Sequence, residues 1–168
     1  MIDLIGTCGD FSLIEKPESG AIAVILNGPD VDQELLGIAC AHAKQSKHVL
    51  SFLYALEVPI QLPLNARMEP ERLRAEKRLR AALLVASQLA CTATAVTIHC
   101  RDAGRSLVEE AKHSRFTALF LQAYQQELPD AYKRLVAYLM AKAPCRVLVN
   151  SVPAGIQADL WLLAQEQV

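Results

Sequence analysis

Residues 21–29 read AIAVILNGP, and the first six of them form an unbroken apolar run. Such a run is typical of a strand that is buried on both faces. Asn27, Gly28 and Pro29 end the run with turn-forming residues. The stretch therefore predicts a central strand of a sheet that is covered on two sides.

The apolar pattern changes to helical spacing directly after this turn. Asp30, with Gln33 three residues on, is predicted to cap a helix whose apolar positions recur over Leu35–Ala43. A second buried strand is predicted over His48–Ala55. This succession of strand, helix and strand is typical of a parallel crossover unit.

The same alternation continues to residue 150. The remaining strands are predicted over Ala95–Cys100, Ala118–Leu121 and Arg146–Asn150, and the remaining helices over Glu71–Cys91, Arg105–His113 and from Asp130 to about Lys142. The predicted fold class is therefore α/β, with a five-stranded parallel sheet and helices on both faces. Ligands of such sheets bind at the carboxyl ends of the strands, where the strand order reverses.

The longest predicted helix is Glu71–Cys91. Its first half overlaps the most basic segment of the chain, from Arg67 to Arg80. Glu76 stands four residues before Arg80, a spacing that allows an ion pair. The apolar stripe expected to face the sheet consists of Leu73, Leu79, Leu83, Leu84 and Leu89. Acidic residues interrupt the basic residues from Arg67 to Arg80, and no aromatic residue lies among them, so we expect a solvated helix face.

The composition indicates one folded domain that does not bind nucleic acid. The chain has 168 residues, of which 52% are hydrophobic and 21% are charged, and this supports a sizeable core. Seventeen Lys and Arg oppose eighteen Asp and Glu, which gives a formal net charge of −1. A nucleic-acid binder usually carries a strong positive field, and this chain lacks one.

Two extensions are predicted to flank the α/β domain of residues 21–150. Residues 1–20 are expected to contain a β-hairpin, and residues 151–168 a terminal helix that exposes Trp161 and Leu162. No apolar run reaches the roughly 18 to 20 residues of a membrane span. The first six residues lack the features of a signal peptide, so we expect a cytoplasmic protein without membrane insertion.

The residue pattern indicates no metal site, cofactor or catalytic centre. No glycine-rich phosphate loop, G-x-S-x-G elbow or dinucleotide fingerprint is present, and the four histidines lack metal-ligand spacing. The cysteines are scattered without a C-x-x-C pair, so free and mostly buried thiols are expected at Cys8, Cys40, Cys91, Cys100 and Cys145. Cys8, beside Gly9, is the thiol most open to reaction, although no basic neighbour stabilises its thiolate.

Three short strings resemble universal stress protein domains. The string APCRVLV at residues 143–149 resembles the A-P-C-P-V-L-V that precedes their last strand, and the strand ending at Asn27-Gly28-Pro29 resembles their opening V-D-G-S. The third string is a succession of three parts. Gly104-Arg105-Ser106 resembles the family's G-x-P, a predicted helix follows in both, and Thr117–Leu121 then resembles the family's D-L-I-V-M-G. The resemblance covers residues 21–150. It implies a Rossmann-like fold of the adenine nucleotide alpha hydrolase type and a role in stress response.

The resemblance fails at the residues that hold ATP in this family. Its ATP-binding members carry G-x2-G-x9-G-[S/T] after the fourth strand, where glycines let backbone amides approach the phosphates. The matching positions here are Gln122 and Gln125, and the third falls on Leu135 or Lys133. Because none is glycine, we expect neither ATP binding nor any other cofactor.

The other positions near the expected ligand edge have two interpretations. Asn27 replaces the Asp that the family carries at the end of its first strand, and Ala55 stands at the position of the family's small apolar residue. Asn27 either contacts a ligand or only forms a turn. Lys133 and Arg134 either bind a phosphate or carboxylate, or belong to a solvated face. The alternative function is therefore that of a small-ligand or nucleotide sensor. Its modified pocket would consist of the residues just named together with Gln122 and Gln125.

The first function expected from the sequence is that of a protein without enzymatic activity that acts through homodimerisation and protein partners. Members of the family commonly pair through the last strand, where this chain has Val147, Leu148 and Val149. An unpaired apolar edge is a liability that dimerisation removes. The resemblance therefore implies a dimer interface at these three residues.

Overall fold

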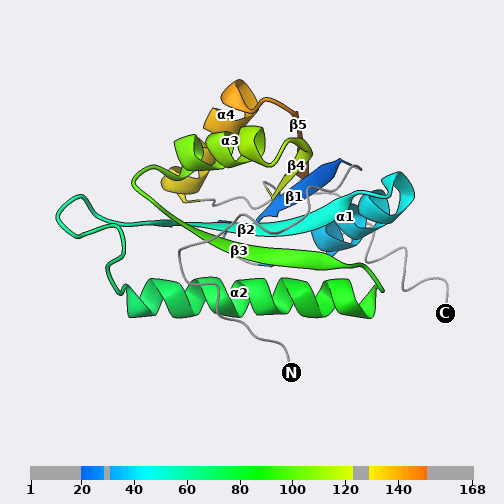
Figure 1. The fold of residues 1–168 in the computed structure, drawn as a ribbon, viewed down its shortest axis with the longest axis horizontal. Helices are drawn as coiled ribbons and strands as arrows, with labels where there is room; N and C mark the ends of the chain where they lie inside the picture. The colour runs from blue at the N-terminus through cyan, green and yellow to red at the C-terminus, as the bar shows by residue number, and fades with distance from the viewer. Residues whose placement is uncertain (1–19, 29–30, 123–128, 151–168) are drawn as a thin grey trace, which may run out of the picture.

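The computed structural model describes residues 20–28, 31–122 and 129–150. Strands and helices alternate along these residues (Figure 1). Their bounds are β1 (Ala21–Ile25), α1 (Gln33–Ser46), β2 (Val49–Glu57), α2 (Glu69–Gln88), β3 (Ala93–Cys100), α3 (Ala103–His113), β4 (Phe116–Gln122), α4 (Asp130–Lys142) and β5 (Arg146–Asn150). Each predicted strand and helix of the α/β domain is present, and β5 has the predicted bounds.

The strands form one parallel sheet in the order β3-β2-β1-β4-β5. The chain proceeds outward from β1 to β3 and then returns to β4 on the other side of β1. The strand order therefore reverses between β1 and β4. The predicted fold class is confirmed.

Helices cover both faces of the sheet, α1 and α2 on one and α3 and α4 on the other (Figure 1). Successive residues of β1 point to opposite faces. Ile22 and Val24 pack in the cluster with α1 and α2, whereas Ala23 and Ile25 pack in the cluster with α3 and α4. Because both faces are buried, β1 needs apolar residues at every position, which explains the unbroken run in the sequence.

Three helices have bounds other than those predicted. The bounds of α2 are Glu69–Gln88 and not Glu71–Cys91. The other two, α1 and α3, each begin directly after a capping aspartate. The capping residue of α1 is Asp32 and not Asp30, because the Oδ1 of Asp32 accepts a hydrogen bond from the backbone N of Glu34 at 2.9 Å. Asp102 caps α3 in the same way, accepting from the backbone N of Arg105 at 2.7 Å, so α3 begins two residues earlier than predicted. A side-chain oxygen that satisfies a free backbone N–H fixes the starts of α1 and α3.

The predicted apolar stripe of α2 is confirmed for Leu79 and Leu83, which pack in the cluster beneath the helix, and is wrong for the other three leucines. Leu73 and Leu84 are 56% and 61% exposed, and Leu89 lies beyond the end of the helix and is also exposed. The residues of α2 buried against the sheet are Ala75, Leu79, Ala82 and Ala86. Their spacing of three and four residues is that of one helix face, and small side chains allow α2 to approach the sheet closely.

The ion pair predicted for Glu76 also differs. Glu76 pairs with Arg72, one turn earlier, and not with Arg80. Arg72 also contacts Glu69 at 2.8 Å, so it stands between two carboxylates on the exposed side of α2. Exposed pairs of this kind contribute little to stability.

The predicted hairpin within residues 1–20 and the predicted helix within residues 151–168 lie outside the described residues, as do Cys8 and Trp161. Over residues 20–28, 31–122 and 129–150, none of the helices has the length and apolar character needed to cross a membrane.

Candidate functional site

The carboxyl ends of β1 and β4 meet where the strand order reverses, and this edge is the candidate site. Asn27 and Gly28 follow β1 directly, and Gln122 is the last residue of β4. The first turns of α1 and α4 also begin near this edge, because each helix follows one of the two strands. Ligands of open parallel sheets bind at such an edge.

Asn27 is hydrogen-bonded to β2 through both ends of its side-chain amide. Its Nδ2 donates to the carbonyl oxygen of Ala55 at 2.7 Å, and the backbone N of Ala55 donates to its Oδ1 at 2.9 Å. The amide side chain thereby imitates a backbone peptide and extends the pairing of β1 with β2 by one step. The structure brings Asn27 and Ala55 together, as expected for neighbouring strand ends, but they bind each other.

Replacing Asn27 by Ala is expected to lower the free energy of unfolding by about 1–3 kcal/mol, because the part-buried N–H and C=O of Ala55 then lose their partner. Urea unfolding followed by circular dichroism measures the change. Asn65→Ala is the matched control, since Asn65 is exposed and should cost less than about 0.5 kcal/mol. Equal losses in the two variants would contradict the assigned role of Asn27.

Arg78 reaches the same edge from α2. One guanidinium nitrogen, Nη1, donates to the carbonyl of Leu26 at 3.1 Å and also to the carbonyl of Gly28. The guanidinium carbon lies 6.0 Å from the ring centroid of Tyr54, within the range of a cation–π contact. Arg78 belongs to the segment predicted to be a solvated face, and that prediction is wrong for this residue.

Gln122 and Tyr132 occupy the space beside Gly28. The hydroxyl of Tyr132 donates to the backbone oxygen of Gln122 at 2.6 Å, and the Gln122 residue is only 2% exposed. A Cβ added to Gly28 would stand 3.1 Å from Oε1 of Gln122 and 3.3 Å from the Tyr132 hydroxyl oxygen. Glycine is thus favoured at position 28 because the turn passes closely over two buried side chains.

The amide nitrogen of Gln122 is a buried side-chain group that the described residues leave unsatisfied. Its Nε2 is buried and has no hydrogen-bond partner among them. A buried donor without a partner costs free energy. This nitrogen is therefore the atom of the candidate site best suited to meet an acceptor.

Burial raises the pKa of Tyr132 to about 12, although the positive charge of Arg78 opposes the shift. The folded protein thus holds the neutral phenol more strongly than the unfolded chain does, where the ordinary pKa is 10.0. The resulting stabilisation is complete below about pH 10 and is lost as the pH rises towards about 12.

We therefore expect the free energy of unfolding to fall steeply in this alkaline range, and to fall less in Tyr132→Phe. Cys40 and Cys100 contribute the same trend in both proteins, because burial raises the pKa of their thiols to about 12 and about 11. Urea unfolding at a series of alkaline pH values measures the difference. Tyr138→Phe, which removes a more exposed phenol, is the control; identical pH curves for all three proteins would refute the prediction.

Lys133 and Arg134 lie on the outer side of α4. Both are exposed, and the Nζ of Lys133 donates to the carboxylate of Asp130 at 3.4 Å. Leu135, the other residue aligned with the third family glycine, is buried in the core with α3. These positions support the interpretation of a solvated face. Gln125 lies outside the described residues.

A further pair of polar side chains, which the sequence did not suggest, closes the edge next to β5. The Nδ2 of Asn150 donates to Oδ2 of Asp32 at 3.0 Å, while the other oxygen of Asp32 caps α1. Asp32 is buried, and both of its oxygens are satisfied. The end of β5 is thereby tied to the start of α1.

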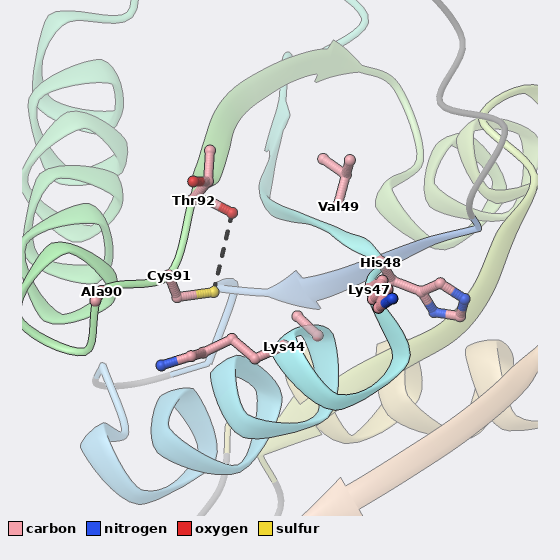
Figure 2. A pocket seen from close by; sticks show the side chains of 8 residues that line it. Lys44, Lys47, His48, Val49, Ala90, Cys91 and Thr92 are labelled. Carbon is pink, nitrogen blue, oxygen red and sulfur yellow. Dashed lines mark hydrogen bonds between the residues drawn. The ribbon is translucent and has the colours of Figure 1, made fainter.

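Two hollows in the described part of the chain lie outside the junction of β1 and β4. One cavity of about 300 Å³ lies at the opposite end of the sheet, between Lys44 and Thr92 (Figure 2). A second of about 370 Å³ lies against Glu57 and Arg101. Neither is lined by Asn27, Gln122 or Tyr132, and no cluster of His, Cys, Asp or Glu that could hold a metal occurs in the described ranges.

The three residues predicted for a dimer interface divide between the two faces of β5, which is an edge strand of the sheet. Val147 and Val149 are partly buried against the cluster with α3 and α4. Leu148 points to the other face and is 43% exposed. It stands beside Phe120 in the parallel register, so its exposed side chain borders the layer that contains α1.

Solved universal stress proteins share this fold. UspA from Lactobacillus plantarum matches with a TM-score of 0.59 and 22% identity over 78% of this chain and 97% of that chain. The universal stress protein from Archaeoglobus fulgidus matches with a TM-score of 0.63 and 12% identity over 77% and 92%. Its complex with dAMP matches with the same score and identity over 77% and 96%. The resemblance indicated by the sequence motifs is therefore confirmed for the fold.

No protein-family model matches the sequence, and no curated protein matches it.

Proposed function

We propose that this chain is a universal stress protein-like domain that does not bind ATP and catalyses no reaction. It acts in the cytoplasm, in stress response or its regulation, by forming a homodimer and contacting protein partners. The observation that carries this proposal is the filling of the carboxyl edge by the protein's own side chains, in a fold shared with universal stress proteins.

Four side chains support the absence of ATP binding. Asn27 is held by Ala55, and Arg78 is held by the carbonyls that follow β1. Gln122 and Tyr132 lie against Gly28 and fill the space beside this turn. The approach of a triphosphate to the backbone at this edge would require several of these contacts to break.

The open edge of β5 supports the homodimer. Its outer backbone N–H and C=O groups have no neighbouring strand among the described residues, and the exposed Leu148 lies on the same strand. Pairing with β5 of a second copy would satisfy the backbone groups and bury Leu148. Sedimentation velocity at micromolar concentration tests this part: a dimer is expected, and a monomer would contradict it.

A second function, that of a small-ligand or nucleotide sensor with a modified pocket, is favoured by one observation. The buried Nε2 of Gln122 has no partner among the described residues and is suited to donate to a ligand. The Archaeoglobus fulgidus protein of the same fold was solved with dAMP. Calorimetric titration with AMP and cyclic nucleotides separates the two functions, because a saturable heat from either would favour the sensor.

A further inference from the structure

Cys40 and Cys91 lie together between α1 and the start of β3, although they are far apart in sequence. The Sγ of Cys91 is directed at the backbone oxygen of Cys40 at 4.0 Å and at that of Thr92 at 3.9 Å. Both residues belong to the apolar cluster beneath α1 and α2. Burial raises the pKa of Cys40, and the neighbouring Cys91 raises it further.

The two thiols differ in their access to solvent. Cys91 is 9% exposed and lines the open cavity at the amino ends of the strands, beside Lys44 and Thr92 (Figure 2). Cys40 is 1% exposed and does not line this cavity. A small oxidant can therefore reach Cys91 first, with Cys40 placed behind it.

We propose that Cys40 and Cys91 are a peroxide-sensitive pair that closes into a disulfide and joins α1 to the segment between α2 and β3. Two observations carry the proposal. The Sγ of Cys91 lies 4.0 Å from the backbone oxygen of Cys40 across a helix–strand junction, and Cys91 borders a cavity large enough for hydrogen peroxide. Buried single cysteines usually act only as small apolar residues, but a pair with one accessible member can also be oxidised.

The reaction balances with hydrogen peroxide as the oxidant. The sulfur of Cys91 attacks one peroxide oxygen, the O–O bond breaks, and Cys91 becomes a sulfenic acid with release of one water. The sulfur of Cys40 then attacks Sγ of Cys91, the S–S bond forms, and the S–O bond breaks. The departing hydroxide takes the proton of Cys40 and leaves as a second water. Two thiols are oxidised, and one peroxide is reduced to two waters.

The order of attack follows from the environments of the thiols. Burial raises the pKa of Cys40 to about 12, so that thiol stays protonated at neutral pH and is a poor first nucleophile. Lys44 lies near the pair, and its Nζ donates to the backbone oxygen of Leu89 at 3.1 Å. Its positive charge lowers the pKa of Cys40 in part but does not outweigh burial.

The disulfide would restrain the unfolded chain by closing the loop from residue 40 to residue 91, which contains β2 and all of α2. Closing a loop of this length stabilises the folded state mainly by limiting the freedom of the unfolded one. We expect Tm to rise by roughly 5–10 °C on oxidation. The pair would thus make the fold more resistant to unfolding under oxidising conditions.

The experiment treats the full chain with hydrogen peroxide, blocks the remaining thiols with iodoacetamide and maps the tryptic peptides by mass spectrometry. The expected result is a peptide in which Cys40 is joined to Cys91, together with the rise in Tm, both reversed by dithiothreitol. Alkylated Cys40 and Cys91 beside an oxidised Cys145, which is the more exposed thiol, would overturn the proposal.

Two variants provide the controls. Cys145→Ala should form the same joined peptide as the unaltered chain, whereas Cys40→Ala should leave a sulfenic acid at Cys91, trapped by dimedone, without a rise in Tm. An equal rise in Tm in Cys40→Ala would overturn the proposal. The peptide map of the unaltered chain remains decisive even if a variant folds poorly.

Discussion

Leu148→Asp is expected to convert the proposed dimer into monomers. The side chain is exposed on edge strand β5, so the substitution should be tolerated in a single copy. In a β5–β5 interface, the same side chain would place an unpaired carboxylate in apolar surroundings. If the substitution makes the free energy of dimerisation about 3 kcal/mol less favourable, the Kd of the dimer rises by at least about 100-fold. Sedimentation velocity over a range of concentrations measures it.

Leu84→Asp is the matched control for this prediction. Leu84 is also an exposed leucine, at 61%, but it lies on α2, whereas Leu148 lies on β5. The control should retain the dimer with an unchanged Kd. If Leu148→Asp remains dimeric while Leu84→Asp dissociates, the interface lies over α2, and the assignment to β5 is wrong.

Arg78→Met is expected to lower the free energy of unfolding by about 2–4 kcal/mol, the largest stability change that we predict for a polar residue. The guanidinium holds the carbonyls of Leu26 and Gly28, so its removal leaves two part-buried acceptors without this partner. Methionine keeps a long apolar side chain at this position, which separates the lost hydrogen bonds from lost packing of the stem. Urea unfolding measures the change.

Arg80→Met serves as the control, because Arg80 is exposed on the same helix. A loss below about 0.5 kcal/mol is expected there. Similar losses in the two variants would show that α2 responds to a missing positive charge in general and would remove the specific role of Arg78.

The central strands were largely predictable because they are buried on both faces and therefore read as continuous apolar runs. Ala21–Ile25 and Ala118–Leu121 are clear cases, since every residue of these two stretches is buried within a strand. The register of the strands and the first residues of the helices were harder to predict from the sequence. Asp30 and Asp32 are equally good capping residues in sequence, and the sequence pattern alone does not determine that Asp32 is the one that meets a free backbone N–H.

The face of α2 was predicted only in part because leucine was given more weight than alanine. Five leucines suggested one stripe, yet Leu73 and Leu84 point to solvent, and three alanines with Leu79 pack on the sheet. The alanine spacing was visible in the sequence and would have identified the inner face. It would also have placed Arg78, three residues after Ala75, near that face.

The candidate site was predictable in position but not in content. The carboxyl edge follows from the topology, and Asn27, Ala55 and Gln122 all lie there. Their partners depend on distances between segments that are remote in sequence, such as Asn150 with Asp32 or Tyr132 with Gln122. No local pattern encodes these contacts, nor the meeting of Cys40 with Cys91.

Isothermal titration calorimetry with ATP and Mg²⁺ tests most directly whether the edge between β1 and β4 is closed to a triphosphate. We predict no saturable heat at millimolar ATP, because Arg78, Gln122 and Tyr132 occupy the place where the phosphates would approach the backbone. Saturable heat with one ATP per chain, abolished by Gln122→Leu, would contradict this and would identify the edge as a working nucleotide site.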